Sequence, residues 1–257
     1  MKTIKISGFT ICLMLSILSL TACGQRDNAI QKNEGKGFAV LELFTSEGCS
    51  SCPPADELLA ELQKDQQGKE VYLLAYHVDY WDRQGWKDVF SQADYSKRQV
   101  QYGHWLDKPQ IYTPQVVING KAEFVGSEEF AIRNAISAGL AEGPASALKL
   151  EAYQGKDGLN VHYQATGRLK GSVLAVAVVQ KSAVSKVEGG ENAGHTLSHV
   201  QIVRKLQTYP LSEKGDGVVT VAVPKDLHTA DFEILGLLQD KNKGEILGAA
   251  KAEWRKL

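Results

Sequence analysis

The sequence lacks several features that would place it in a familiar functional class. It has no excess of positive charge, because 29 Lys and Arg residues face 30 Asp and Glu residues. Nucleic-acid-binding domains usually carry a basic field, so we expect no nucleic-acid partner. After residue 22 no apolar run reaches the ~20 residues that a membrane-spanning helix needs, and we expect the mature part to be soluble. Internal repeats, a nucleophilic serine motif and a phosphate-binding glycine loop are also missing.

Cysteine is scarce, and two of the four cysteines lie in the N-terminal segment. A short basic region there precedes an apolar run of about ten residues, which is typical of a signal peptide rather than of a membrane span. The run ends in Leu20-Thr-Ala-Cys23, which resembles the lipobox of bacterial lipoproteins. We therefore predict a lipoprotein signal peptide over residues 1–22. The alternative is an ordinary signal peptide whose cleavage leaves Cys23 at the new N-terminus.

Lipidation of Cys23 would attach the protein to a membrane, with the polar residues 23–37 as a tether. Gly24 follows the cysteine where an acidic retention signal would otherwise stand. We therefore expect a bacterial cell-envelope location, with the periplasmic side of the outer membrane favoured. Only Cys49 and Cys52 then remain as thiols, in a compartment where disulfides form and persist.

Residues 38–145 have the pattern of an α/β thioredoxin-like domain. Continuous apolar runs over residues 38–44 and 71–76 read as buried strands, and a helix that begins near Pro53 separates them. Together they predict a parallel βαβ unit with Cys49-Ser-Ser-Cys52 between the first strand and the helix. A further strand follows Thr113-Pro114, then an Asn-Gly hairpin signal and a last helix. We expect a longer helix near residues 88–106 in the insertion between these parts.

After residue 145 short strand-like stretches follow one another without a helical pattern. They cover residues 148–153, 159–165, 173–179, 197–206, 218–223, 232–238 and 246–250. Short strands separated by turn residues are typical of a β-sandwich. We therefore predict a small all-β sandwich domain over residues 146–257.

The cysteine pair is the candidate catalytic centre. At the end of a strand that feeds a helix, free backbone N–H groups and the helix dipole lower the pKa of a cysteine. We predict that Cys49, as the more exposed thiol, attacks a substrate disulfide and that Cys52 resolves the mixed disulfide. Pro114, after a cis peptide bond, would align the substrate backbone. The alternative is a structural disulfide, although so short a loop adds little stability.

Several stretches resemble a secreted thioredoxin-like family catalogued as the domain of unknown function numbered 1223. They are Leu43–Asp56 around the cysteines, His77-Val-Asp-Tyr-Trp81, Gly85-Trp-Lys-Asp88, Tyr112-Thr-Pro-Gln115 and Glu191-Asn-Ala-Gly194. The resemblance covers nearly all of residues 38–250. It implies a thioredoxin-like half and a β-rich half, and it supports the fold more than an activity.

Three acidic or basic side chains are candidates for proton handling. Glu42 lies on a buried strand and can relay protons to Cys52, or it can point outward at a strand edge. His77 and Asp79 follow the strand 71–76 at the edge of the sheet where Cys49 lies, because functional groups gather at the carboxyl ends of parallel strands. They can form a proton-handling pair or a structural hydrogen bond. Glu47, two residues before Cys49, would oppose formation of the thiolate.

Aromatic residues near the same edge are candidates for a substrate groove. Thr113, Trp81 and Trp86 belong to it, and the insertion 79–110 should form a wall or lid over the cysteines. The alternative for the tryptophans is local core packing. Zinc usually needs four N or S ligands and only two cysteines are present; His77 or His104 could complete such a site, as the less favoured alternative. His195 and His199 would lie ~13 Å apart along a strand, so we predict no metal.

These observations predict a thiol–disulfide oxidoreductase whose redox-active disulfide needs no other cofactor. Its partners would be protein thiols and disulfides, and a redox protein that recycles the cysteine pair. The alternative is a non-enzymatic envelope binding module built on a thioredoxin frame.

Overall fold

The computed structural model describes residues 37–156 and 158–255. The predicted signal peptide, Cys23 and nearly all of the tether lie outside the described residues. Within the described ranges, no helix combines the length and the apolar character that crossing a membrane requires.

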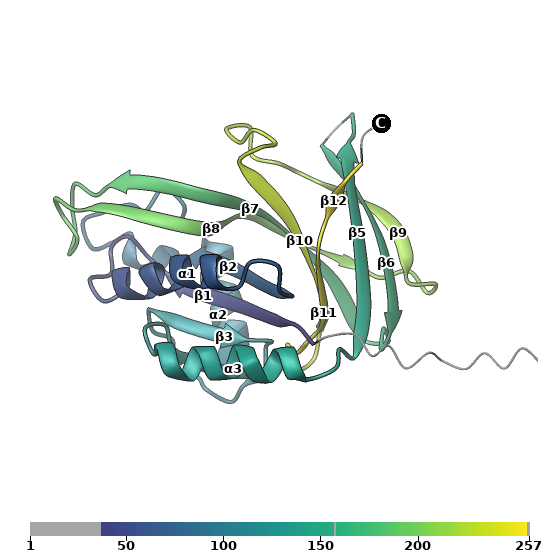
Figure 1. The fold of residues 1–257 in the computed structure, drawn as a ribbon. Coiled ribbons are helices and arrows are strands. Elements are labelled where there is room, and N and C mark those ends of the chain that lie inside the picture. Colours follow the sequence, from purple (N-terminus) through teal and green to yellow (C-terminus); the bar gives the residue numbers. More distant parts are fainter. Residues whose placement is uncertain (1–36, 157, 256–257) are drawn as a thin grey trace, which may run out of the picture. The chain divides into compact units, whose positions relative to one another are not determined.

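Most of the described chain is organised around an eight-stranded mixed sheet (Figure 1). Strands β1 (Ala39–Thr45) and β2 (Val71–His77) are parallel and joined by α1 (Pro53–Asp65), as the apolar runs predicted. β3 (Gln115–Ile118) pairs antiparallel with β1, and β4 (Ala122–Val125) pairs with β3 as an edge strand. The cysteine pair lies in the connection between β1 and α1.

Four strands of the second half belong to the same sheet. β7 (Ser172–Lys186), β8 (Thr196–Pro210), β10 (Phe232–Asp240) and β11 (Ile246–Lys251) continue it in the order β11-β10-β7-β8-β2-β1-β3-β4. The second sheet has the order β12-β5-β6-β9; its strands are β5 (Ser146–Gln154), β6 (Leu159–Gly167), β9 (Asp216–Val221) and β12 (Glu253–Trp254). The prediction of an α/β thioredoxin-like domain followed by a separate all-β sandwich is therefore wrong.

The burial of β7 explains the error. Its residues 173–179 were read as a sandwich strand, but almost all of them are buried because both faces of β7 are covered. Leu174, Val176 and Val178 pack into the core between the two sheets. Ala175, Ala177 and Val179 pack on the other side, with the side chains of β1, β2 and α2. A strand buried on both faces belongs in the centre of a large sheet rather than in one wall of a sandwich.

Helices cover both faces of the β1–β2 part of this sheet. α1 and α3 (Glu129–Ala141) pack on one face through leucine and isoleucine side chains. α2 (Ala93–Trp105) packs on the other face through Tyr95 and Tyr102. α2 begins later than predicted, because residues 79–92 form the short helix η1 (Asp79–Trp81) and turns in which Asp88 and Asp82 bind backbone N–H groups.

Candidate functional site

Cys49 and Cys52 form a disulfide at the point where β1 leads into α1. Their Cα atoms are 5.4 Å apart. Cys52 is the residue before the first helical position, and its carbonyl oxygen accepts hydrogen bonds from the backbone N–H groups of Ala55 and Asp56, at 2.9 and 3.2 Å. The cysteine pair therefore lies at the N-terminal end of a helix, where the helix dipole favours negative charge. Pro53 and Pro54 have no N–H groups to offer, and those of Ala55 and Asp56 are already bonded.

Both cysteines are fully buried, with 0 % exposure each. The prediction that Cys49 would be the more exposed residue is therefore wrong. Ser50 and Ser51 between them are exposed, so the loop reaches the surface while its sulfur atoms do not. A segment from the second half of the chain buries these sulfur atoms.

The connection between β7 and β8, residues 187–195, covers the cysteine loop; we call it the cap loop (Figure 1). Asn192 Nδ2 donates hydrogen bonds to the carbonyl oxygens of Glu47 and Cys49, both at 2.9 Å. Glu191 Oε2 accepts hydrogen bonds from the backbone N–H of Ser50 at 3.0 Å and from its hydroxyl at 2.7 Å. The cap loop thus binds the residues on both sides of Cys49.

The predicted groove residues line another side of the same loop. Trp81 Nε1 donates to Thr113 Oγ1 at 2.7 Å, and Ser51 Oγ lies 3.4 Å from the carbonyl oxygen of Thr113. Trp86 Nε1 donates to Glu47 Oε2 at 2.7 Å. The Thr113–Pro114 peptide bond is cis, as predicted. The structure thus brings Thr113, Trp81 and Trp86 to the cysteine loop, and Pro114 follows directly.

Next to the disulfide lies a buried cluster of two histidines and three carboxylates. Its members are at most 6 % exposed: Glu47, Asp56, His77, Asp88 and His199. His77 Nδ1 contacts Asp88 Oδ2 at 2.6 Å. His199 lies between two acids, with Nδ1 3.7 Å from Asp56 Oδ2 and Nε2 3.5 Å from Glu47 Oε1. The two imidazole rings meet edge to face, with centroids 4.9 Å apart.

Burial and pairing move the pKa values of this cluster in different directions. Burial would lower the pKa of His77, but the charge and hydrogen bond of Asp88 outweigh it and raise that pKa. Asp88 has a lowered pKa, because His77 and two backbone N–H groups outweigh its burial. For Asp56 burial dominates, and its pKa is raised in spite of the neighbouring histidines. Asp56 is therefore the acid of the cluster that most readily keeps a proton.

The other two proton-handling candidates lie elsewhere. Glu42 faces α2, on the side of the sheet opposite α1, and binds Arg98 through both carboxylate oxygens, at 2.5 and 2.9 Å. Asp79 accepts from the hydroxyl of Ser96. His77 therefore pairs with Asp88 rather than with Asp79, and Glu42 belongs to a buried ion pair rather than to the cysteine site.

Sequence reasoning missed Asp56 and His199. Asp56 follows Cys52 by four residues, a spacing that puts two side chains on one face of a helix, so this signal was available. His199 was considered only with His195 as a metal pair, and its neighbours come from distant parts of the chain. In the described ranges, no group of three or more His, Cys, Asp or Glu residues is arranged to hold a metal ion.

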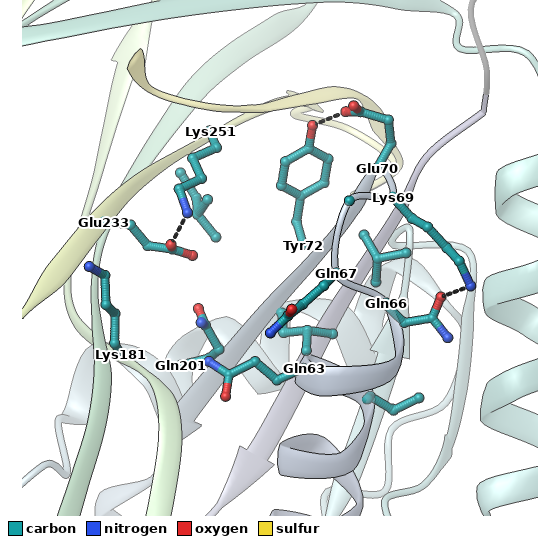
Figure 2. Close-up of a pocket in the computed structure, with 15 residues that line it drawn as sticks. Gln63, Gln66, Gln67, Lys69, Glu70, Tyr72, Lys181, Gln201, Glu233 and Lys251 are labelled. Carbon is teal, nitrogen blue, oxygen red and sulfur yellow. Dashed lines mark hydrogen bonds and ion pairs between the residues drawn. The ribbon is translucent and has the colours of Figure 1, made fainter. Parts of the chain in front are cut away.

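A prominent cavity of the described chain does not lie at the cysteines. It has a volume of about 640 Å³ and lies at the other end of β2, beside the last turn of α1 (Figure 2). The candidate redox site is therefore closed, whereas the open pocket belongs to a different part of the molecule.

Solved structures similar to this chain include the following two. A protein of Agrobacterium tumefaciens, known from its crystal structure, shares 26 % of its residues with this chain at a TM-score of 0.67; the match covers 87 % of this chain and 97 % of that one. HBP35 of Porphyromonas gingivalis shares 15 % at a TM-score of 0.60, over 86 % of this chain and 78 % of that one, a likeness of fold alone. No curated protein matches the sequence.

The family model described as a protein of unknown function, DUF1223, matches residues 40–239. That range contains the cysteine loop, the buried cluster and the cap loop. The chain belongs to the DUF1223 family.

Proposed function

We propose that this protein is a thiol–disulfide oxidoreductase of the bacterial cell envelope that acts on protein thiols and disulfides through Cys49 and Cys52. The observation that carries the proposal is the disulfide at the N-terminus of α1, beside the cis Thr113–Pro114 segment and a buried cluster of acids and histidines. A disulfide that closes so short a loop does little for stability. A helix N-terminus and nearby acids and histidines are instead the surroundings that thiol–disulfide exchange uses.

In the oxidised protein, a thiolate of a substrate dithiol attacks Sγ of Cys49. The bond between the two cysteines breaks, and Cys52 leaves as a thiolate that takes up a proton. The second substrate thiol loses its proton and attacks the substrate sulfur of the mixed disulfide, so that Cys49 leaves and is protonated in turn. The substrate loses two electrons and two protons, and the cysteine pair gains them. The reverse sequence reduces a substrate disulfide, and the relative potentials set the direction.

Cys52 is buried in the closed structure, so a nearby buried acid is a suitable source of its proton. Asp56 is the candidate, because it lies one helical turn beyond Cys52 and its raised pKa favours the protonated form. His199 contacts Asp56 on one side and Glu47 on the other. Neither imidazole nitrogen has a hydrogen-bond partner among the described residues, so transfer of a proton between the two carboxylates through His199 requires these distances to shorten. The proton-handling role predicted for His77 and Asp79 passes in this proposal to Asp56 and His199.

The cap loop has to move before a protein substrate can reach either sulfur atom. Between the cap loop and residues 47–50, Asn192 donates two hydrogen bonds and Glu191 accepts two. Gly189 and Gly190 also lie close to Gly85 and Trp86. A segment held in this way can open locally while the sheet stays folded. We propose that opening of the cap loop exposes Cys49 first, because Ser50 next to it is held directly by Glu191.

The burial of both sulfur atoms favours one alternative, a non-enzymatic binding module with a structural disulfide. Turnover separates the two functions. The oxidoreductase should reduce insulin catalytically with a thiol reductant. Its Cys52→Ser variant should accumulate mixed disulfides with partner proteins, and Cys49→Ser should trap none. A wild-type protein without turnover, together with no trapped partner from either variant, would leave the binding module standing.

Lipid anchoring through Cys23, on the periplasmic side of the outer membrane, is part of the proposal and rests on the lipobox-like Leu20–Cys23. We also propose a relationship to the thioredoxin superfamily for the β1–α1–β2 segment with its cysteine pair and the cis-proline segment. A redox protein of the same compartment would recycle the cysteine pair.

A further inference from the structure

The eight-stranded sheet opens between β2 and β8. β2 pairs with β1 along its whole length, but with β8 only at Ala75, opposite Ile202. Backbone N–H and C=O groups of alternate residues in a strand point to the same side, so those of Leu73 face the side on which Ala75 meets β8. In the described ranges no strand pairs with β2 beyond that point toward its start. Leu73 therefore presents the unpaired groups of a strand edge.

The pocket of about 640 Å³ lies at this opening (Figure 2). Its walls come from the end of α1, the start of β2 and strands β7, β8, β10 and β11. Four glutamine side chains line it: Gln63, Gln66, Gln67 and Gln201. Each amide offers both a donor and an acceptor, as a peptide group does. These amides are the part of the wall that matches a peptide backbone, although Gln66 Oε1 already accepts a hydrogen bond from Lys69 Nζ at 3.0 Å.

Gln201 is the most unusual residue of this wall. Its φ of 53° lies in the left-handed region, which residues other than glycine rarely adopt. The residue is only 7 % exposed, and its Oε1 is buried without a hydrogen-bond partner among the described residues. Strained backbone and a buried amide oxygen without a partner both oppose folding, and such combinations gather at ligand sites.

The charged residues of the pocket are already paired. Lys251 forms an ion pair with Glu233, and Lys181 Nζ donates to the carbonyl oxygen of Ala230 at 2.7 Å. The hydroxyl of Tyr72 donates to Glu70 (Figure 2). The lining holds three lysines and two glutamates, so its net charge is small and gives no strong field to attract a small anion or cation. The pocket would therefore recognise a ligand through hydrogen bonds along the free edge of β2.

We infer that this pocket binds an extended segment of a partner polypeptide, which adds to the free edge of β2. Main-chain bonds to Leu73 hold such a segment, and the glutamine amides bind its remaining peptide groups, as in strand addition generally. The inference does not depend on the cysteines, because the pocket lies at the opposite end of β2 from His77 and the disulfide. The occupant is another polypeptide in extended form.

The test uses the whole mature protein and a thiol-free probe, reduced and carboxymethylated ribonuclease A, which is unfolded. Amide hydrogen exchange, read by mass spectrometry, should slow at Val71–Leu74 when the probe is added. The variant with Gln63→Ala and Gln201→Gly should bind the probe at least tenfold more weakly, measured by fluorescence anisotropy. Glycine suits the left-handed backbone at position 201, so this variant should remain folded. Gln101→Ala, an exposed glutamine of α2, is the matched control and should bind as the wild type does.

A variant with both Cys49→Ser and Cys52→Ser should bind the probe unchanged, which separates this inference from the proposed exchange chemistry. The inference is overturned if saturating probe leaves exchange at Val71–Leu74 unchanged. It is also overturned if the glutamine variant binds the probe with wild-type affinity. The single variant Gln63→Ala should show a smaller loss of affinity than the double variant.

Discussion

The cap loop should control how fast the disulfide can be reduced. Asn192 Nδ2 donates two hydrogen bonds of 2.9 Å to the carbonyl oxygens that flank Cys49. Each such bond contributes ~0.5–1.5 kcal/mol net, so Asn192→Ala should destabilise the closed cap by about 1–3 kcal/mol. If reduction proceeds through the open cap, its rate should rise by roughly 5- to 150-fold.

The assay is the reduction of the wild type and the variant by excess phosphine in native buffer, followed by alkylation and mass spectrometry. A matched control comes from another buried asparagine. Asn119 Oδ1 accepts from the backbone N–H of Val40 at 2.6 Å, and its Nδ2 donates to the carbonyl oxygen of Phe38 at 3.1 Å. Asn119→Gly removes both bonds at the far end of β1 and fits the left-handed backbone at this position.

The two variants lose the same kind of contact at opposite ends of one strand. Asn119→Gly should lower the free energy of unfolding without speeding reduction. Reduction of Asn192→Ala at the wild-type rate would show that the cap loop does not gate the disulfide. Equal acceleration in both variants would mean that reduction proceeds through global unfolding, and the gating argument would then be refuted.

Three further predictions address the anchor, the acid of the cluster and the buried ion pair. Cys23→Ser should release the protein from the membrane fraction or leave the precursor uncut, and normal retention of a correctly cut variant would rule the anchor out. Asp56 has a raised pKa, so the wild type should gain stability as the pH falls through that pKa; Asp56→Asn should flatten this trend in urea unfolding measured from pH 8 to 4, and an unchanged slope would contradict the assignment. Arg98→Met should cost about 3–5 kcal/mol of unfolding free energy, because it leaves Glu42 buried without its partner, yet reduction of the disulfide in native buffer should keep its rate; a faster reduction would return Glu42 to the redox site.

Apolar runs and turn residues in the sequence predicted the individual strands and the start of α1. The apolar runs 38–44 and 71–76 became β1 and β2, and the prolines after Cys52 marked the start of α1. The strands after residue 145 were also found, because turn residues bound them. How those strands assemble could not be read in the same way, since both a sandwich wall and a central strand produce an apolar run. Only burial of β7 on both faces separates the two, and that depends on what packs against it.

The residues of the candidate site likewise fall into those that the sequence predicted and those that it did not. Residues near the cysteines in sequence, or at the carboxyl ends of β1 and β2, were found because topology alone brings them to one edge of the sheet. Asp88 entered only as part of a family motif, and His199 only as half of a rejected metal pair. Asp88 and His199 join the buried cluster because their segments fold back onto that edge of the sheet. Their spacing along the chain does not reveal this contact.

The error in the fold class and the gaps in the predicted site have one physical origin. In a separate sandwich, the strands after residue 145 would not place the cap loop over Cys49, the thiol that the sequence led us to expect to be the more exposed. Instead β8 lies beside β2 in one sheet, at Ala75 and Ile202, and the β7–β8 connection extends over the end of β1. The same continuity brings His199 between Glu47 and Asp56. Joining the two halves therefore both buries the disulfide and supplies its neighbouring imidazole, so a redox role of this protein has to include an opening step.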